Sequence, residues 1–499
     1  MQKPETIDPP FRSGNGLSPK APAFLWLIPA IFLALFPFAF INRTIHIDEA
    51  WIGEQAYTLQ RDGIVTNNLF QDYPPLDGEI VIYHKLPVWF GAAFVRIFGW
   101  GLYPLRLISA LAGAAMVLLL FLYLSSSHSR AAAITGAMLL LWIPQFWEAM
   151  RIFRPEILMT LFGFASFVLV KKALEKSAIF DSLTAGICAG LAGLAHPLGL
   201  VFAAAGFLSL LLEKKGRAAL VFGLFSITTF IPYISGYFGA PELFLRQLTD
   251  NGILASKVSF TWSTPILNLL NEHKRVFRNG DVIGITVLFI LTLLLNWRHR
   301  ADAGKFYWRY LIIVFVLLAI APFPKITRYY LPLLPFLSVF VALSIDHLLR
   351  RGDSFLPSVR VLIFGCLILF SVYGFYALGR AAFIDRHASR DLETNRLLAD
   401  NMKRGSRIIA RFDMVFDYID DYIILSWWGC EQRLQGNFNP EAVEEYAAGL
   451  GVKYIVFTKN SLEQMSLDSE MLAARLSSFT PLLMLPERER YLFVKEGRD

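Results

Sequence analysis

Long apolar runs alternate with short basic segments along most of the chain. The first run, Phe24 to Ile41, is followed by ten blocks of membrane-spanning length, at residues 104–124, 131–147, 156–170, 183–199, 200–212, 217–238, 281–297, 307–322, 329–349 and 357–379. This pattern predicts an α-helical polytopic membrane protein of about eleven spans, within a range of about nine to thirteen. His196-Pro197 interrupts the stretch 183–212. That interruption fits either a tight hairpin or one kinked helix, and the hairpin agrees better with the charges.

The cations predict the orientation of these spans. With a cytoplasmic N-terminus, every inside segment is basic; these segments include Lys20, Arg130, Lys171, Lys172, Lys214, Lys215 and Arg350. The predicted divisions are a cytoplasmic tail 1–23, a transmembrane domain 24–379 with an outer loop 42–103, and an extracytoplasmic α/β domain 380–499. The expected location is a plasma membrane, in bacteria the inner membrane.

The outer loop 42–103 is too long for a simple connector. Its stretch from Asp48 to Gln60 places apolar residues on one face, and Gly63 can end a helix, so we expect a helix along the membrane surface. Residues 80–98 are apolar and aromatic but include His84 and Lys85. This second stretch is predicted to be interfacial or re-entrant.

The last 120 or so residues change character because charged residues return. A β-like run lies within Arg407 to Ile419, and Asn439-Pro440-Glu441 is typical of a helix start. Val452–Thr458 and Tyr491–Lys495 are expected to be strands. Together these signals predict a small α/β unit.

Composition excludes several functional classes. Of 499 residues, 55% are hydrophobic and only 17% charged, which excludes an ordinary soluble enzyme. Membrane topology accounts for the net charge of +7, since no long basic run suggests nucleic-acid binding. Three widely separated cysteines indicate neither a disulfide framework nor a thiolate metal site, and no glycine loop for a nucleotide occurs. His46 and His84 lack ligand spacing, so no metal or other cofactor is expected.

Acidic residues near the ends of spans are candidates for catalysis. Asp48 and Glu49 follow the first span, where they could cap the surface helix or offer a general base to an acceptor group. Glu156 follows Arg154-Pro155 and opens a later span. It too fits either a plain helix start or a site residue.

Cations and aromatic residues gather at the same predicted boundary. The cations are Lys85, Arg151, Arg154, Lys325 and Arg328, which could snorkel to lipid headgroups or bind and stabilise a lipid phosphate as a leaving group. The aromatic residues of the outer loop are Trp51, Tyr57, Tyr73, Tyr83, Trp89, Trp100 and Tyr103. They fit an interfacial belt or, alternatively, stacking on a sugar ring.

The order of four motifs resembles that of the C-type membrane glycosyltransferases. The motifs are His46-Ile47-Asp48-Glu49-Ala50, Tyr83-His84-Lys85-Leu86-Pro87-Val88-Trp89, Arg154-Pro155-Glu156 and Arg328-Tyr329-Tyr330-Leu331-Pro332. The likeness covers about residues 24–350 and is strongest to the dolichyl-phosphate-mannose protein mannosyltransferases and the bacterial transferase that adds aminoarabinose to lipid A.

The resemblance implies an inverting transferase, hexosyl or pentosyl, that moves a sugar from a polyprenyl-phosphate carrier at the outer membrane face. Asp48 would match the catalytic carboxylate, Glu49 its neighbour and Glu156 the second acidic position. Lys85 and Arg328, with Arg154 and Lys325, would bind the donor phosphate; Tyr57, Tyr83, His84 and Tyr329 would line the substrate.

The acceptor, a lipid, glycan or protein, cannot be carried over. The family's Lys-Pro-Pro-Leu is here Lys85-Leu86-Pro87-Val88. A transporter or lipid flippase without covalent chemistry is the alternative function, and a receptor or scaffold acting through residues 380–499 is a third.

Overall fold

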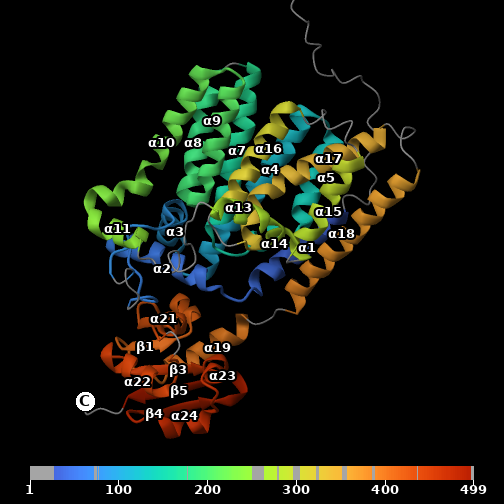
Figure 1. Ribbon diagram of the computed structural model, residues 1–499. Coiled ribbons are helices and arrows are strands. Elements are labelled where there is room, and N and C mark those ends of the chain that lie inside the picture. The colour runs from blue at the N-terminus through green and yellow to red at the C-terminus, as the bar shows by residue number, and fades with distance from the viewer. Residues whose placement is uncertain are drawn as a thin grey trace, which may run out of the picture.

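The computed structural model describes residues 27–71, 76, 78–176, 178–249, 263–277, 280–295, 304–321, 325–350, 357–384, 388–434 and 437–495. The predicted tail 1–23 lies outside these residues. A bundle of long helices carries a small sheet domain at one end, where the C-terminus also lies (Figure 1).

Each of the eleven predicted apolar blocks coincides with helical structure. The helices of the bundle are α1 (Leu27–Ile41), α4 (Leu102–Ser127), α5 (Arg130–Trp142), α6 (Pro144–Met150), α7 (Pro155–Lys176), α8 (Ile179–Ala195), α9 (Leu200–Leu212), α10 (Gly216–Gly239), α15 (Gly280–Leu295), α16 (Lys305–Ile320), α17 (Leu334–Arg350) and α18 (Pro357–Phe383). The polytopic helical fold class is therefore confirmed.

The number of spans and their orientation stay predictions. Within the described ranges, five helices are long and apolar enough to cross a membrane alone, or six if the bent pair Thr264–Phe277 and Gly280–Leu294 forms one span. Four shorter apolar helices are also present, at Pro29–Ile41, Arg130–Trp142, Ile179–Ala195 and Pro197–Leu212. At His196-Pro197 the chain makes a 3-10 turn, η2 (Pro197–Gly199), and α9 then packs beside α8 as the hairpin interpretation predicts (Figure 1).

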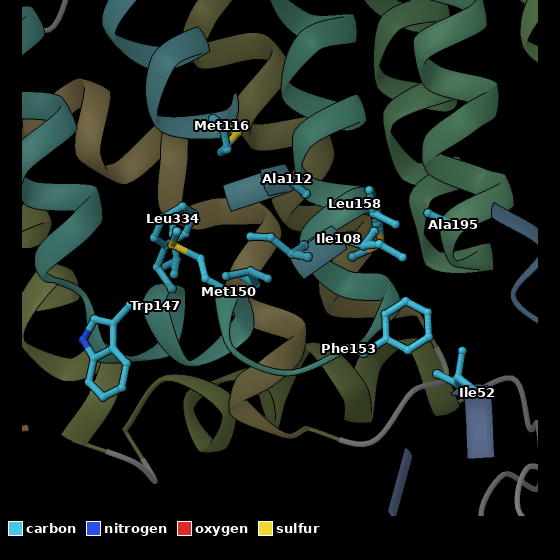
Figure 2. Packing of buried hydrophobic residues seen from close by; sticks show 14 of the residues in the cluster. Ile52, Ile108, Ala112, Met116, Trp147, Met150, Phe153, Leu158, Ala195 and Leu334 are labelled. Atoms are coloured by element: carbon cyan, nitrogen blue, oxygen red, sulfur yellow. The ribbon is translucent and has the colours of Figure 1, made fainter. Parts of the chain in front are cut away.

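Apolar side chains and close helix contacts hold the bundle together. Ile108, Ala112, Met150, Leu158 and Leu334, from α4, α6, α7 and α17, belong to one buried cluster (Figure 2). Small residues bring the backbones close, as in many membrane bundles. A Cβ atom at Gly186 of α8 would lie 2.4 Å from the carbonyl oxygen of Phe222 in α10, so only glycine fits there.

Several shorter elements lie at the end of the bundle that faces the sheet domain. They are α2 (Ile47–Asp62), α3 (Lys85–Phe98), α11 (Pro241–Thr249), α13 (Thr264–Leu270), α14 (Glu272–Phe277) and the 3-10 helix η4 (Thr327–Leu333). The predicted helix from Asp48 is confirmed as α2. It begins with a capping box between His46 and Glu49 and ends at Gly63 with φ 74°.

The C-terminal domain is a five-stranded mixed sheet with short helices. The strands are β1 (Arg407–Ala410), β2 (Ile423–Ser426), β3 (Tyr454–Thr458), β4 (Phe479–Leu485) and β5 (Arg490–Lys495), and the helices are α19 (Ala388–Ala399), η6 (Phe412–Met414), α20 (Val415–Tyr418), α21 (Trp427–Arg433), α22 (Pro440–Gly449), α23 (Lys459–Gln464), α24 (Ser469–Arg475) and η7 (Pro486–Arg488). The order is β2-β1-β3-β5-β4, with β1 parallel to β2 and β3, and β5 antiparallel to β3 and β4. Three of these strands match the sequence predictions; β2 and β4 were not predicted.

Specific contacts fasten this domain to α2, to the loop after α2 and to the connection between α3 and α4. The Tyr57 hydroxyl donates a hydrogen bond to the Asp420 carboxylate. The Trp100 indole N–H donates to the carbonyl oxygen of Val415 at 3.2 Å. Ser426 Oγ donates to the carbonyl oxygen of Leu69 at 2.8 Å. Tyr57 thus makes a contact between domains in this structure, and its role in lining substrate stays a prediction.

Candidate active site

Asp48 lies in the first turn of α2 between two guanidinium groups. Its Oδ2 atom is 2.6 Å from Arg154 Nη1 and 3.2 Å from Arg328 Nη1. The Asp48 side chain keeps 26% of its surface exposed. The structure thus joins three predicted site residues that are as much as 280 positions apart in sequence.

His46 fixes the backbone that presents Asp48. Its Nδ1 atom accepts a hydrogen bond from the Asp48 N–H at 3.1 Å, so the proton of the neutral ring is on Nε2. Burial lowers the pKa of His46, against the attraction of the Asp48 carboxylate. His46 therefore caps α2 as a neutral residue at pH 7.

Arg154 joins Asp48 to Glu156. Arg154 Nη2 is 2.7 Å from Glu156 Oε1 and Nε donates to Oε2 at 3.1 Å, a bidentate pair. Burial alone would lower the pKa of Arg154, but the carboxylates of Glu156 and Asp48 outweigh it and raise the pKa above its usual value. Glu156 is 3% exposed at the start of α7, so it holds Arg154 in place from behind.

Two histidines and a tyrosine continue this polar cluster. The His84 and His196 rings stack at 4.9 Å with an interplanar angle of 19°, and the His196 ring lies 5.6 Å from that of Tyr329. Burial lowers the pKa of His84, which favours the neutral ring. His84 and Tyr329 were predicted site residues. His196 was noted only as a break between helices, because nothing in its local sequence indicates its partners.

A cavity of about 330 Å³ adjoins the two arginines that hold Asp48. Arg154, Glu156 and Arg328 line it together with Arg43, His46, Gln145, Glu148, Ala149, Ile152, Ile157, Asp281 and Leu331. Of the charged lining residues, Arg43, Glu148 and Asp281 were not among the predicted site residues. Its charged lining consists of three arginines and three acids, so the cations are not in excess. Two of the arginines, Arg154 and Arg328, converge on the single oxygen Asp48 Oδ2, and such a convergent pair suits a phosphate oxygen.

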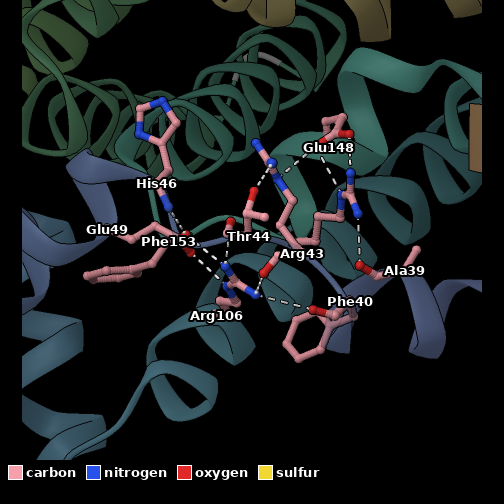
Figure 3. Close-up of polar contacts among 10 residues, drawn as sticks. Ala39, Phe40, Arg43, Thr44, His46, Glu49, Arg106, Glu148 and Phe153 are labelled. Carbon is pink, nitrogen blue, oxygen red and sulfur yellow. Dashed lines mark hydrogen bonds and ion pairs between the residues drawn. The ribbon is translucent and has the colours of Figure 1, made fainter. Parts of the chain in front are cut away.

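Glu49 points into the protein and is fully buried. Its carboxylate binds Arg106 Nε and Nη2, each at 2.8 Å, and accepts from the backbone N–H of Phe153 at 3.0 Å and of His46 at 2.9 Å (Figure 3). All of its acceptor positions are therefore occupied. This geometry does not favour the catalytic role predicted for Glu49, and it indicates instead that Glu49 positions the start of α2.

Lys85 makes its contacts away from Asp48 and its two arginine partners in this structure. Its ammonium group donates to the carbonyl oxygen of Val81 at 3.0 Å and lies 3.7 Å from the centre of the Tyr83 ring. Burial lowers the pKa of Lys85 to about 8. Lys85 and Tyr83 are thus brought together beside His84, but they do not line the 330 Å³ cavity beside Arg154 and Arg328.

Lys325 belongs to a separate ionic cluster. Its Nζ atom is 3.0 Å from Glu272 Oε2, and Arg275 Nη1 is 3.2 Å from Glu272 Oε1. Arg275 also donates to the carbonyl oxygens of Leu318 and Tyr329. Lys325 therefore pairs with Glu272 in this structure, and its phosphate contact stays a prediction. The contact that holds the backbone of η4 is made by Arg275. Glu272 and Arg275, both in α14, were missed because no sequence motif marks them.

Metal ligands of the usual kinds do not gather in the part of the chain that the structure describes: no three His, Cys, Asp or Glu side chains there could hold an ion together. A metal-independent site stays a prediction.

Comparison with known proteins gives the same family as the motifs. A family model described as dolichyl-phosphate-mannose-protein mannosyltransferase matches residues 86–235. No curated protein matches the sequence significantly.

Solved structures share the whole fold. ArnT from Cupriavidus metallidurans bound to undecaprenyl phosphate matches with a TM-score of 0.65 and 13% identity, over 94% of this chain and 97% of that one. The archaeal oligosaccharyltransferase AglB from Archaeoglobus fulgidus, in complex with an inhibitory peptide and a dolichol-phosphate, matches with a TM-score of 0.54 and 13% identity, over 93% and 74%. The predicted resemblance to C-type membrane glycosyltransferases is confirmed, and at this identity the structural matches establish the fold.

Proposed function

We propose that this protein is an inverting glycosyltransferase that takes a sugar from a polyprenyl-phosphate carrier. The observation that carries the proposal is the Asp48 carboxylate held between Arg154 and Arg328, beside a cavity that both arginines line. The family model supports sugar transfer. The lipid phosphates named for ArnT and AglB support the class of donor.

The reaction is a direct displacement at the anomeric carbon. The acceptor hydroxyl attacks this carbon and gives its proton to the Asp48 carboxylate, while the bond from the anomeric carbon to the phosphate oxygen breaks. The leaving phosphate keeps the electron pair. Arg328 and Arg154 stabilise its charge by moving part of their pairing from Asp48 to the phosphate.

Buried partners keep this arrangement ready before the donor binds. Glu156 fixes Arg154, the Glu272–Arg275 pair fixes the backbone of Tyr329 next to Arg328, and Glu49 with Arg106 fixes the start of α2. Such preorganisation lets the site stabilise the transition state without further rearrangement. The C-terminal domain lies at the same end of the bundle as α2 (Figure 1), and the predicted topology of that domain supports a reaction at the outer face.

The test compares Asp48→Asn with wild type in nanodiscs. The lipid that co-purifies with the protein is identified by mass spectrometry and then offered as a labelled donor. Asp48→Asn is expected to lower transfer on the order of 10²–10⁴-fold. Asp62→Asn, which changes an exposed acid at the far end of the same helix, is the matched control and should transfer at the wild-type rate. Wild-type turnover by Asp48→Asn would remove Asp48 as the base, and lipid flux without a covalent product would favour a flippase.

A further inference from the structure

A cavity lies between the C-terminal domain and the start of α2. It has a volume of about 1180 Å³, above the 300–1,000 Å³ or so of a drug-sized site. Its wall on the bundle side consists of Thr44, Ile45, His46 and Ile47. His46 lines both this cavity and the smaller one beside Arg154 and Arg328. The same residue, two positions before Asp48, therefore borders both cavities.

The topology of the sheet places this cavity where α/β sheets bind ligands. The segments that follow the carboxyl ends of β1, β2 and β3 line it, with Phe412, Trp428 and Asn460 as examples. In the order β2-β1-β3 the chain passes from β1 to β2 on one side and then crosses back to β3 on the other side of β1. This reversal makes a switch point between β1 and β3. Ligands in open α/β sheets bind in the crevice outside the carboxyl ends of the strands at such a point.

The charges around the cavity balance. The lining has four acidic residues, Glu393, Glu431, Glu487 and Glu489, and four basic ones, Arg411, Lys459, Arg488 and Arg490. Several of them neutralise one another, since Arg488 pairs with Glu393 at 2.8 Å and Lys459 with Glu489 at 3.1 Å. A strongly anionic group such as a phosphorylated headgroup has no excess of cations to bind there.

The remaining lining combines aromatic rings with amides and hydroxyls. Phe412 and Trp428 provide ring surface, and Asn460, Gln464 and Thr44 provide hydrogen-bonding groups. Few aliphatic side chains are present, so an acyl chain would gain little by entering. An extended peptide would pair with an edge strand of the sheet, β2 or β4. This cavity lies at the ends of the strands instead, so its position does not favour a peptide ligand.

We infer that this cavity binds the acceptor and that the acceptor presents a neutral oligosaccharide to Asp48. This inference rests on the proposed function and names its acceptor class. Sugar rings stack on aromatic side chains and offer several hydroxyls to amides, and the volume accommodates more than one sugar unit. One hydroxyl would pass His46 and reach the Asp48 carboxylate, which accepts its proton during transfer.

The first experiment determines the linkage of the transferred sugar. Wild type in nanodiscs receives the labelled lipid donor and a chloroform–methanol–water extract of the cell envelope, and methylation analysis locates the label. A glycosidic bond to a sugar hydroxyl is the expected result. A bond to a phosphate or to an amino-acid side chain would overturn the inference and leave the proposed function intact. No transfer of label to any product would contradict the proposed function itself, and the inference would fall with it.

The second experiment changes the cavity and leaves the Asp48 cluster untouched. Asn460 and Gln464 are exposed polar residues of the wall, so their replacement by alanine should not disturb folding. The double variant Asn460→Ala/Gln464→Ala should raise KM for the extract at least tenfold, with kcat and the donor KM within twofold of wild type. Asn401→Ala, an exposed residue of the same domain outside the cavity, should match wild type. An unchanged acceptor KM in the double variant would refute the assignment of the cavity.

Discussion

The buried pair of Glu49 and Arg106 allows a quantitative test of the difference between a positioning acid and a catalytic one. Both side chains have 0% exposure. Arg106 also donates to the carbonyl oxygens of Phe40, Arg43 and Thr44 at 3.3, 3.0 and 3.2 Å, so it ties the end of α1 to the start of α2 (Figure 3). Lysine could not make this set of contacts, because it lacks the planar fork of donors.

Removing one partner leaves the other as an unpaired buried charge. We expect Glu49→Gln and Arg106→Met each to cost about 3–5 kcal/mol of stability. The double variant Glu49→Leu/Arg106→Met should cost less than the sum of the two single changes, because no unpaired charge remains. It should still be less stable than wild type, since the three carbonyl oxygens and two N–H groups lose their partners, at about 1–3 kcal/mol for each buried group that water cannot reach.

Chemical unfolding in mixed micelles, followed by tryptophan fluorescence, measures these differences. Asp48→Asn is the matched control, because the neighbouring carboxylate is partly exposed and its loss should change stability far less than the loss of Glu49. Full additivity of the two single changes would refute the pairing. A Glu49→Gln protein that is as stable as wild type but inactive would restore the catalytic role predicted from the sequence.

Three further predictions concern groups near the site. Burial raises the pKa of Glu54 from 4.5 to about 7. The contribution of its protonation to stability, on the order of 3 kcal/mol, is therefore complete below about pH 4.5 and is lost as the pH rises through about 7. Thermal unfolding between pH 4.5 and 8 should show this loss in wild type and not in Glu54→Gln. The pKa of Lys85 is about 8, so wild-type kcat/KM for the donor should decline above pH 8 if the charged amine binds phosphate. Lys85→Arg should move that decline to higher pH. Identical pH profiles of the two proteins would exclude the contact between Lys85 and phosphate. Glu272→Gln should lower the unfolding temperature more than Lys325→Gln, because it leaves both Arg275 and Lys325 unpaired; equal shifts would argue against a shared carboxylate.

Hydropathy and local capping signals predict much of the fold because they act over short distances. The apolar blocks locate the bundle helices, and the Asn439 cap with Pro440 at the first position locates α22. Two strands escape this reasoning. β2 has only four residues, and β4 contains Pro481, which is tolerated because β4 is an edge strand with a shift in register after that residue.

The composition of the site is harder to predict because its partners come from distant segments. Arg106 follows Glu49 by 57 positions, and Arg328 follows Asp48 by 280. The resemblance to a family indicated Arg328, whereas nothing in the sequence indicated that Glu272 would take Lys325 as its partner. Charge and position near a span end select candidates, but tertiary packing decides which ions pair.

Asp48 and Glu49 show this most directly, because they are identical in charge and adjacent in the chain. Successive residues of an α-helix project about 100° apart, so the Asp48 carboxylate stays partly exposed beside Arg154 while the Glu49 carboxylate turns inward to Arg106. The helix phase is set by His46, whose ring accepts the Asp48 N–H and whose own N–H is held by Glu49. The buried acid therefore fixes the register that leaves its neighbour exposed between two arginines, and the two carboxylates act as one unit although only Asp48 is placed to meet a substrate.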